Sequence, residues 1–167
     1  SLSHFTYCYP FVTYQFPLFQ VAIRGLSMHN GFEGKANSVG ERSMLGVFRE
    51  VAIAIQHEPV GQLATFDRMF EGIRGALKSG LQSAINTAES HLNDAYAVRV
   101  LKALFLVKYV KEFKASLRNL SVLMTERFGE DAATQRNKLQ AALYLLEQQT
   151  YIQRNGDVYE FLTDEEK

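Results

Sequence analysis

Apolar side chains recur at intervals of three and four residues along most of the chain, the spacing that places them on one face of an α-helix. This pattern predicts a first helix over about residues 17–29 and a second over about 39–57. The second follows Ser38-Val39-Gly40-Glu41, in which a hydroxyl and a glutamate three residues later can cap a helix reciprocally. A third amphipathic helix, of about seven turns, is expected over 65–92.

Two features qualify this helical pattern in the first half of the chain. Gly72, Gly75 and Gly80 fall inside the third predicted helix, where each costs about 1 kcal/mol relative to alanine, so close packing must offset them. The segment from His4 to Phe16 carries six aromatic residues and one proline. We expect it to be an extended strap that lies on the core.

The last 70 residues predict three more helices, over about 97–113, 117–128 and 132–149. Two short strands then flank Asn155-Gly156, a dipeptide typical of a tight hairpin turn in which both positions have positive φ. Three helices followed by a hairpin have the order of a winged helix.

The expected fold is therefore mainly α with a small β-hairpin. We expect a helical subdomain over residues 3–95, a winged-helix domain over 96–163, and the start of a further helix at 164–167. The chain begins at Ser1 without a methionine and ends inside that last element, so we interpret it as a fragment of a longer protein.

Composition narrows the class of protein. The 167 residues are 47% hydrophobic and 22% charged, which suits a globular protein of at most two small domains. Cys8 is the single cysteine, so no internal disulfide can form. The sequence has no secretory signal and no apolar run of membrane-spanning length, so a cytoplasmic location without membrane contact is expected.

Charge restricts the ways in which the protein could bind DNA. Eighteen basic and eighteen acidic residues cancel, so any DNA contact must be local. Residues 97–118 hold six basic side chains and one acid, whereas residues 157–167 hold five acids and one lysine. The polar start of the third winged-helix helix and the hairpin supply the candidate DNA-binding residues, namely Gln135, Arg136, Lys138 and Arg154. Winged helices also dock on proteins, and the fold alone does not choose between the two uses.

Candidate chemistry is sparse. The four histidines are scattered without ligand spacing, so no metal site is expected, and no catalytic residue is assigned. Residues 31–36 resemble a phosphate loop only superficially, because alanine stands at position 36 where serine or threonine would bind magnesium. Arg42, in the first turn after the capping box, could face a phosphate or could be a solvated side chain.

Several segments carry a family resemblance. They are Tyr9-Pro10-Phe11, Tyr14-Gln15-Phe16, Leu18-Phe19-Gln20, Gly25-Leu26, His29-Asn30, the run Gly40-Glu41-Arg42-Ser43-Met44-Leu45-Gly46-Val47-Phe48, and the C-terminal stretch from Leu146 to Thr163. Together they resemble an internal segment of the P-loop ATPases of BREX phage-defence systems, the BrxC or PglY family.

This resemblance implies a large bacterial AAA+ ATPase that binds ATP and magnesium outside this segment, and partners among other BREX components or other ATPase domains of the same chain. The helical subdomain would correspond to an AAA+ lid, with Arg42 as a sensor of the γ-phosphate. The segment itself is expected to bind no cofactor and to hydrolyse no ATP, because phosphoryl transfer needs a phosphate cradle, a magnesium ligand and a water-positioning group.

Two functions are therefore expected from the sequence. The first is a non-catalytic regulatory or assembly segment of such an ATPase, which couples nucleotide state to a winged helix that docks on DNA or protein. The second is a DNA-binding winged-helix regulator that forms a homo-oligomer through the long helix over 65–92.

Overall fold

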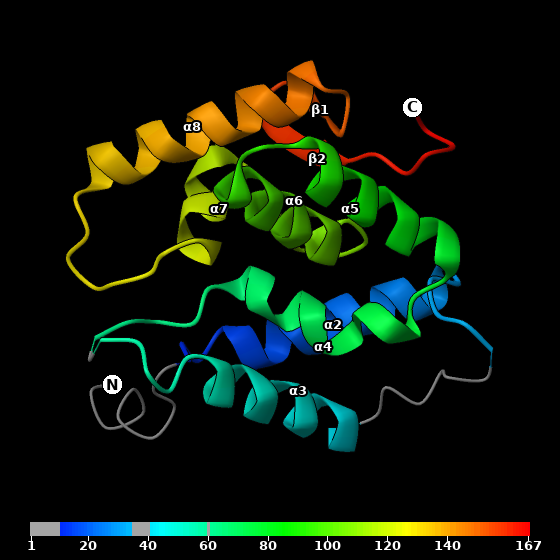
Figure 1. The fold of residues 1–167 in the computed structure, drawn as a ribbon, viewed down its shortest axis with the longest axis horizontal. Helices are drawn as coiled ribbons and strands as arrows, with labels where there is room; N and C mark the ends of the chain where they lie inside the picture. Colours follow the sequence, from blue (N-terminus) through cyan, green and yellow to red (C-terminus); the bar gives the residue numbers. More distant parts are fainter. Residues whose placement is uncertain (1–10, 35–40, 60) are drawn as a thin grey trace.

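A computed structural model describes residues 11–34, 41–59 and 61–167, apart from the side chains of residues 41–43 (Figure 1). The helices and strands follow in this order: α2 (Gln15–Met28), α3 (Glu41–Ala54), α4 (Phe70–Ile73), α5 (Ser79–His91), α6 (Ala95–Val107), α7 (Leu117–Leu123), α8 (Ala132–Gln148), β1 (Ile152–Asn155) and β2 (Val158–Phe161). The fold is mainly helical with one two-stranded antiparallel sheet, as the hydrophobic pattern predicts.

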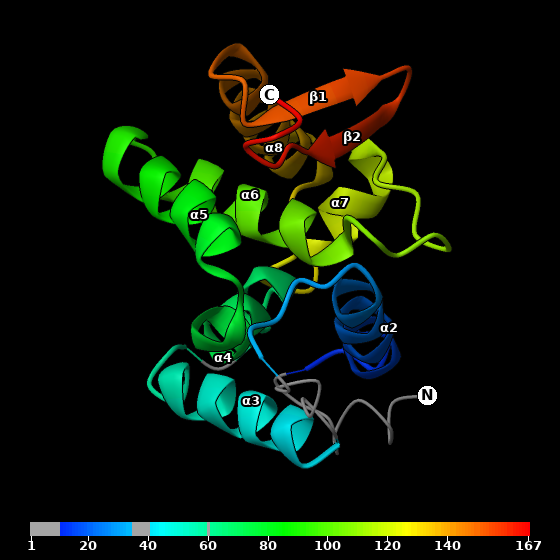
Figure 2. The same cartoon turned by 90° about the vertical axis from the view of Figure 1, so that its right-hand side faces the viewer.

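Helix α6 occupies the centre of the fold. Nine of its 13 residues are buried, and the other four, Ala95, Tyr96, Arg99 and Lys102, fall along one stripe, so other elements must cover most of the helix surface. It contacts α2, α4, α5, α8 and β2. Figures 1 and 2 show α8 and the hairpin on one side of α6, and α2, α4 and finally α3 on the other.

Aromatic rings join α2 to α3. The ring of Phe48 on α3 stacks on Phe16, with 4.5 Å between centroids, and receives Phe11 and Phe19 edge-on at 4.9 and 5.7 Å. Such pairs add stability beyond the area that they bury. Within the predicted aromatic strap over 4–16, Phe11 packs on the core, but Gln15 and Phe16 belong to α2 and are not extended. Residues 4–10 of the strap lie outside the described part of the chain.

The predicted helices over 17–29, 39–57 and 132–149 are confirmed as α2, α3 and α8, with ends shifted by a few residues. Ser38, the hydroxyl of the predicted capping box, lies outside the described residues.

The helices predicted over 97–113 and 117–128 exist as α6 and α7, but both end early. Helix α6 ends at Val107, and α7 ends at Leu123 because the chain after it pairs with a distant segment. There, the N–H of Leu63 donates to the carbonyl of Glu126 at 2.6 Å. A β-bridge joins Gln62 to Arg127.

The single helix predicted over 65–92 is wrong. The chain forms a 3-10 turn at Phe66–Met69, the short α4, another 3-10 turn at Arg74–Ala76, and then α5. The break falls at Leu77 and Lys78, whose ψ angles of 151° and 146° are extended. Backbone pairing with the segment after α2 holds it open: the N–H of Glu33 donates to Ala76 O at 2.9 Å, and that of Lys78 donates to Gly31 O at 2.8 Å.

The predicted hairpin is confirmed, with a different turn. Asn155 pairs with Val158, so the two turn residues are Gly156 and Asp157, one position later than the sequence suggests. Only the first turn position is a glycine at positive φ, with a value of 63° for Gly156. The N–H of Tyr159 also donates to Ala115 O at 3.0 Å, which ties β2 to the segment before α7.

The division into two domains at residues 95 and 96 stays a prediction. Buried side chains from both predicted parts form one continuous hydrophobic cluster in the structure. Residues 164–167 form a hydrogen-bonded turn, in which the N–H groups of Glu166 and Lys167 donate to Thr163 O. In the part of the chain that is described, no helix is long and apolar enough to cross a lipid bilayer.

Replacing Gly72 with alanine should destabilise the fold. A Cβ at this position would lie 2.5 Å from Cγ1 of Val47, so α3 and α4 would have to move apart, at a cost of about 1–3 kcal/mol. Urea denaturation measures this loss in the free energy of unfolding.

Gly75→Ala is the matched control, because no atom lies within 4 Å of its added Cβ. It should leave the stability unchanged or raise it slightly. Equal destabilisation by the two substitutions would contradict the close approach of α3 to α4.

Candidate nucleic-acid interface

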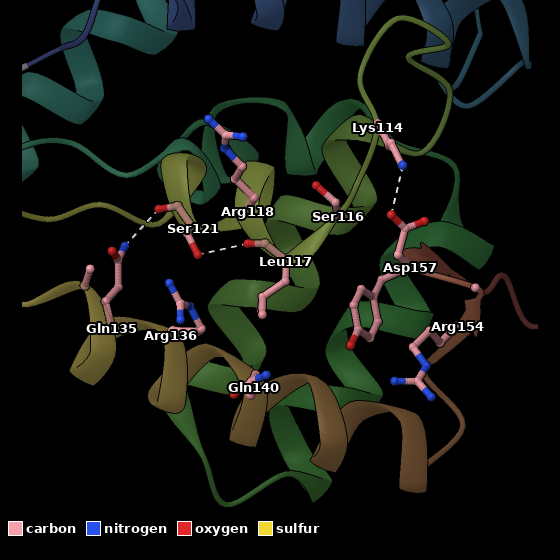
Figure 3. Close-up of a pocket in the computed structure, with 13 residues that line it drawn as sticks. Lys114, Ser116, Leu117, Arg118, Ser121, Gln135, Arg136, Gln140, Arg154 and Asp157 are labelled. Atoms are coloured by element: carbon pink, nitrogen blue, oxygen red, sulfur yellow. Dashed lines mark hydrogen bonds and ion pairs between the residues drawn. The ribbon is translucent and has the colours of Figure 1, made fainter.

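A groove of about 810 Å³ lies between α7, α8 and the hairpin. Figure 3 shows Gln135 at one end of it and the Lys114–Asp157 pair at the other. The residues that line it are mostly polar or basic: Lys114, Ser116, Leu117, Arg118, Ser121, Ala132, Gln135, Arg136, Gln140, Arg154, Gly156, Asp157 and Tyr159.

Local sequence signals place each wall of the groove. The hydroxyl of Ser116 caps α7 by accepting a hydrogen bond from the N–H of Asn119 at 3.2 Å, so Arg118 falls in the first turn of α7. The carboxylate of Asp131 caps α8 in the same way, 3.0 Å from the N–H of Thr134. Arg136 therefore lies on the second turn of α8.

The hairpin forms the third wall. Arg154 on β1 pairs with Tyr159 on β2 across the antiparallel ladder, and both line the groove. Residues directly opposite each other on an antiparallel pair project from the same face, which brings this arginine and this phenol together. The groove thus depends on three segments that are distant in sequence.

The groove is strongly positive for a protein with no net charge. Four basic side chains and one acid line it, a local net of three positive charges. The one acid, Asp157, lies with Oδ2 2.9 Å from Nζ of Lys114, and this hydrogen bond lowers the pKa of the Asp157 carboxyl. Arg118, Arg136 and Arg154 are exposed and have no ion-pair partner among the described residues.

Other basic residues of the 97–118 stretch are neutralised inside the fold. Arg99 pairs with Asp67 at 3.2 Å and with Glu126 at 2.9 Å, and Lys102 pairs with Glu71 and Glu89. The net positive charge of residues 97–118 in the sequence is therefore larger than the positive charge that these residues present to solvent.

Three acids near the C-terminus form ion pairs away from the groove. Glu160 and Glu166 pair with Lys108 at 3.0 and 2.9 Å, and Asp164 pairs with Lys167 at 3.2 Å. Of the five acids in residues 157–167, Asp157 is the one that lines the groove. The acidic C-terminus consequently leaves the groove positive.

The four predicted DNA-binding residues separate into two pairs. Arg136 and Arg154 line the groove, and their guanidinium groups have no partner among the described residues. The side-chain amide of Gln135 instead donates to Ser121 O at 2.8 Å and to Thr125 Oγ1 at 3.2 Å, which fixes α8 to α7. Figure 3 shows the first of these bonds.

Lys138 lies outside the groove. Its Nζ is 4.1 Å from the centroid of the Tyr96 ring, at the start of α6. Burial raises the pKa of the Tyr96 hydroxyl to about 12, so the phenol is neutral and the contact is a cation–π interaction.

Sequence reasoning missed the other three charged residues of the groove, namely Lys114, Arg118 and Asp157. Lys114 and Arg118 were counted in the basic stretch, but nothing local showed that they face the hairpin. The available signal was Ser116, a helix-capping residue that places Arg118 at the start of α7.

Arg42 belongs to the first turn of α3, and its side chain lies outside the described part of the chain. Within the described residues, no group of three or more histidine, cysteine, aspartate or glutamate side chains could hold a metal ion.

The groove is therefore the candidate site, and its excess of basic side chains suits an anion.

Comparison with known proteins adds no assignment. No protein-family model matches the chain, and no solved structure matches it significantly.

Lys108 should be required for a stable hairpin. Its side chain is 3% exposed, and Nζ lies 2.6 Å from Phe161 O and within 3.0 Å of both Glu160 and Glu166. Lys108→Met leaves this carbonyl without its donor and should lower the free energy of unfolding by about 1–3 kcal/mol. Chemical denaturation provides the measurement.

Lys111→Met removes the same charge from an exposed side chain three residues further on. It should change stability little. If both variants unfold at the same denaturant concentration as the parent protein, Lys108 does not anchor the hairpin.

Proposed function

We propose that residues from α6 to β2 form a winged helix that docks on the sugar-phosphate backbone of duplex DNA. The order of elements supports the first half of this proposal: a helix, a short extended segment at Ala115 and Ser116, two further helices and a hairpin. The extended segment pairs with β2 through one isolated β-bridge, between Ser116 and Val158, and through the N–H of Tyr159, which donates to Ala115 O.

The positive groove is the observation that carries the DNA half of the proposal. Arg118, Arg136 and Arg154 come from three different elements, line one concave surface and lack internal partners among the described residues. Arginine guanidinium groups bind phosphate oxygens through paired hydrogen bonds. A row of phosphates is the ligand that such a surface fits best.

The engaged polar groups favour backbone contact over base recognition. Gln135, which could read a base edge, is bonded to α7, and Lys138 is held over Tyr96. Phosphate contacts position a protein on DNA without reading sequence. We therefore expect little preference for DNA sequence.

For the longer protein, we propose a non-catalytic segment of a BREX-type phage-defence ATPase, as the sequence resemblance implies. In this proposal, the part that precedes α6 acts as a lid-like helical unit, and Arg42 senses the nucleotide of an ATPase domain elsewhere in the chain. The contacts of α6 with both α2 and α8 support mechanical coupling between the two parts.

A regulator that dimerises through a long helix over 65–92 has less support. That helix is divided at Leu77 and Lys78, and α5 retains only 13 residues. The continuous pairing surface on which this function depends is therefore absent from the described chain.

Salt-dependent titration with duplex DNA tests the proposed groove. Duplex binding should weaken as salt rises, because each neutralised phosphate contributes about 0.9 to the slope of log K against log salt. Replacing Arg136 and Arg154 with glutamine should reduce this slope by about 2 and weaken binding at every salt concentration.

Arg24→Gln with Arg49→Gln is the matched control. Both arginines are exposed, on α2 and α3, and their replacement changes the net charge by the same amount. It should leave duplex binding unchanged. An equal loss in both double variants, or no duplex binding at low salt, would overturn the proposal and direct the search to a protein partner for the winged helix.

Arg42→Ala in the full-length ATPase tests the proposed nucleotide sensor. If Arg42 meets the γ-phosphate, its loss should lower ATP hydrolysis about tenfold or more, because a charge that stabilises the transition state is removed. Steady-state hydrolysis and nucleotide titration provide the measurements. Unchanged hydrolysis together with unchanged nucleotide affinity would exclude the sensor role.

A further inference from the structure

Asp157 is the single acid among the groove residues, and it occupies the tip of the hairpin. Its carboxylate reaches across the mouth of the groove to Lys114, on the segment before α7, with 2.9 Å between Oδ2 and Nζ (Figure 3). The hairpin thus places a negative charge where the proposed ligand would place a phosphate.

The ion pair between Asp157 and Lys114 is easily exchanged. The two side chains are 72% and 59% exposed, and water and salt screen exposed pairs so strongly that they add little stability. Lys114 also lines the groove together with Arg118 and Arg136. A phosphate at Lys114 would gain from these neighbouring positive charges, whereas the ion pair of Asp157 is with Lys114.

We propose that Asp157 is an internal competitor for the phosphate-binding position at Lys114, which duplex DNA displaces when it docks. This inference rests on the proposed function of the groove. The carboxylate occupies Lys114 in the free protein and repels phosphates that approach the mouth of the groove. It weakens binding of isolated anions most, because a single phosphate must displace Asp157 without contacts to the other three basic groups.

The competition makes Asp157 a specificity-determining residue. A ligand with several phosphates in a row can bind Arg118, Arg136 and Arg154 first and then displace the carboxylate. A small anion gains only one contact. Duplex DNA is therefore favoured over inorganic phosphate by more than its charge alone would give.

Titration of Asp157→Asn with duplex DNA and with inorganic phosphate tests this inference. The substitution keeps the side-chain shape and releases Lys114. Duplex affinity at low salt should rise about three- to tenfold, the effect of removing one partly screened like charge. The salt slope should stay the same, because duplex DNA displaces the carboxylate and contacts the same phosphates in both proteins. The relative gain in affinity should be larger for inorganic phosphate.

Asp164→Asn is the matched control, since Asp164 is also an exposed acid paired with a lysine, Lys167, and does not line the groove. It should leave both affinities unchanged. Lys114→Met provides a second comparison: its effect on duplex binding should be small in the parent protein and several-fold larger beside Asp157→Asn.

The outcomes separate this inference from the proposed function. Duplex binding that responds equally to Asp157→Asn and Asp164→Asn overturns the competition and leaves the DNA-binding groove in place. Failure of the parent protein and both variants to bind duplex DNA or phosphate overturns both proposals. Duplex binding by the parent protein that strengthens in Asp157→Asn and not in Asp164→Asn supports both proposals.

Discussion

The burial of α6 over most of its surface is the constraint on which the rest of the structure depends. Water reaches only the stripe of Ala95, Tyr96, Arg99 and Lys102, so α2, α4, α5, α8 and β2 are placed by the need to cover the remaining apolar surface. Three basic side chains lie on this helix or just after it, namely Arg99, Lys102 and Lys108. Each forms an ion pair with an acid from another element. Hydrophobic contacts have no preferred direction, so these ion pairs help to fix the orientation of the surrounding helices and the hairpin.

The same ion pairs decide where positive charge remains available. Lys108 holds Glu160 and Glu166 on one side of the hairpin, so the opposite side keeps Arg154 with Asp157 as its single nearby acid in the groove. A chain of zero net charge can in this way present a concentrated positive surface. The proposed DNA groove follows from how charges are sorted in the fold, and not from an excess of basic residues.

Local patterns in the sequence were sufficient for α2, α3, α8 and the hairpin, because apolar spacing, caps and turn residues act within a few positions of one another. They failed at Leu77 and at the end of α7, where the chain leaves a helix to pair with the distant segments 31–33 and 62–63. The groove was half predicted: Arg136 and Arg154 follow from the winged-helix order, whereas Lys114 and Asp157 become neighbours only when β2 pairs with Ala115. Periodicity carries no information on such long-range partners.

The backbone bond between Leu63 and Glu126 has a mechanical consequence. It joins the loop after α3 to the loop that connects α7 with α8, and the Arg99–Glu126 ion pair lies beside it. Movement of either loop is therefore expected to displace the other, because the hydrogen bond joins the two loops and the ion pair joins one of them to α6.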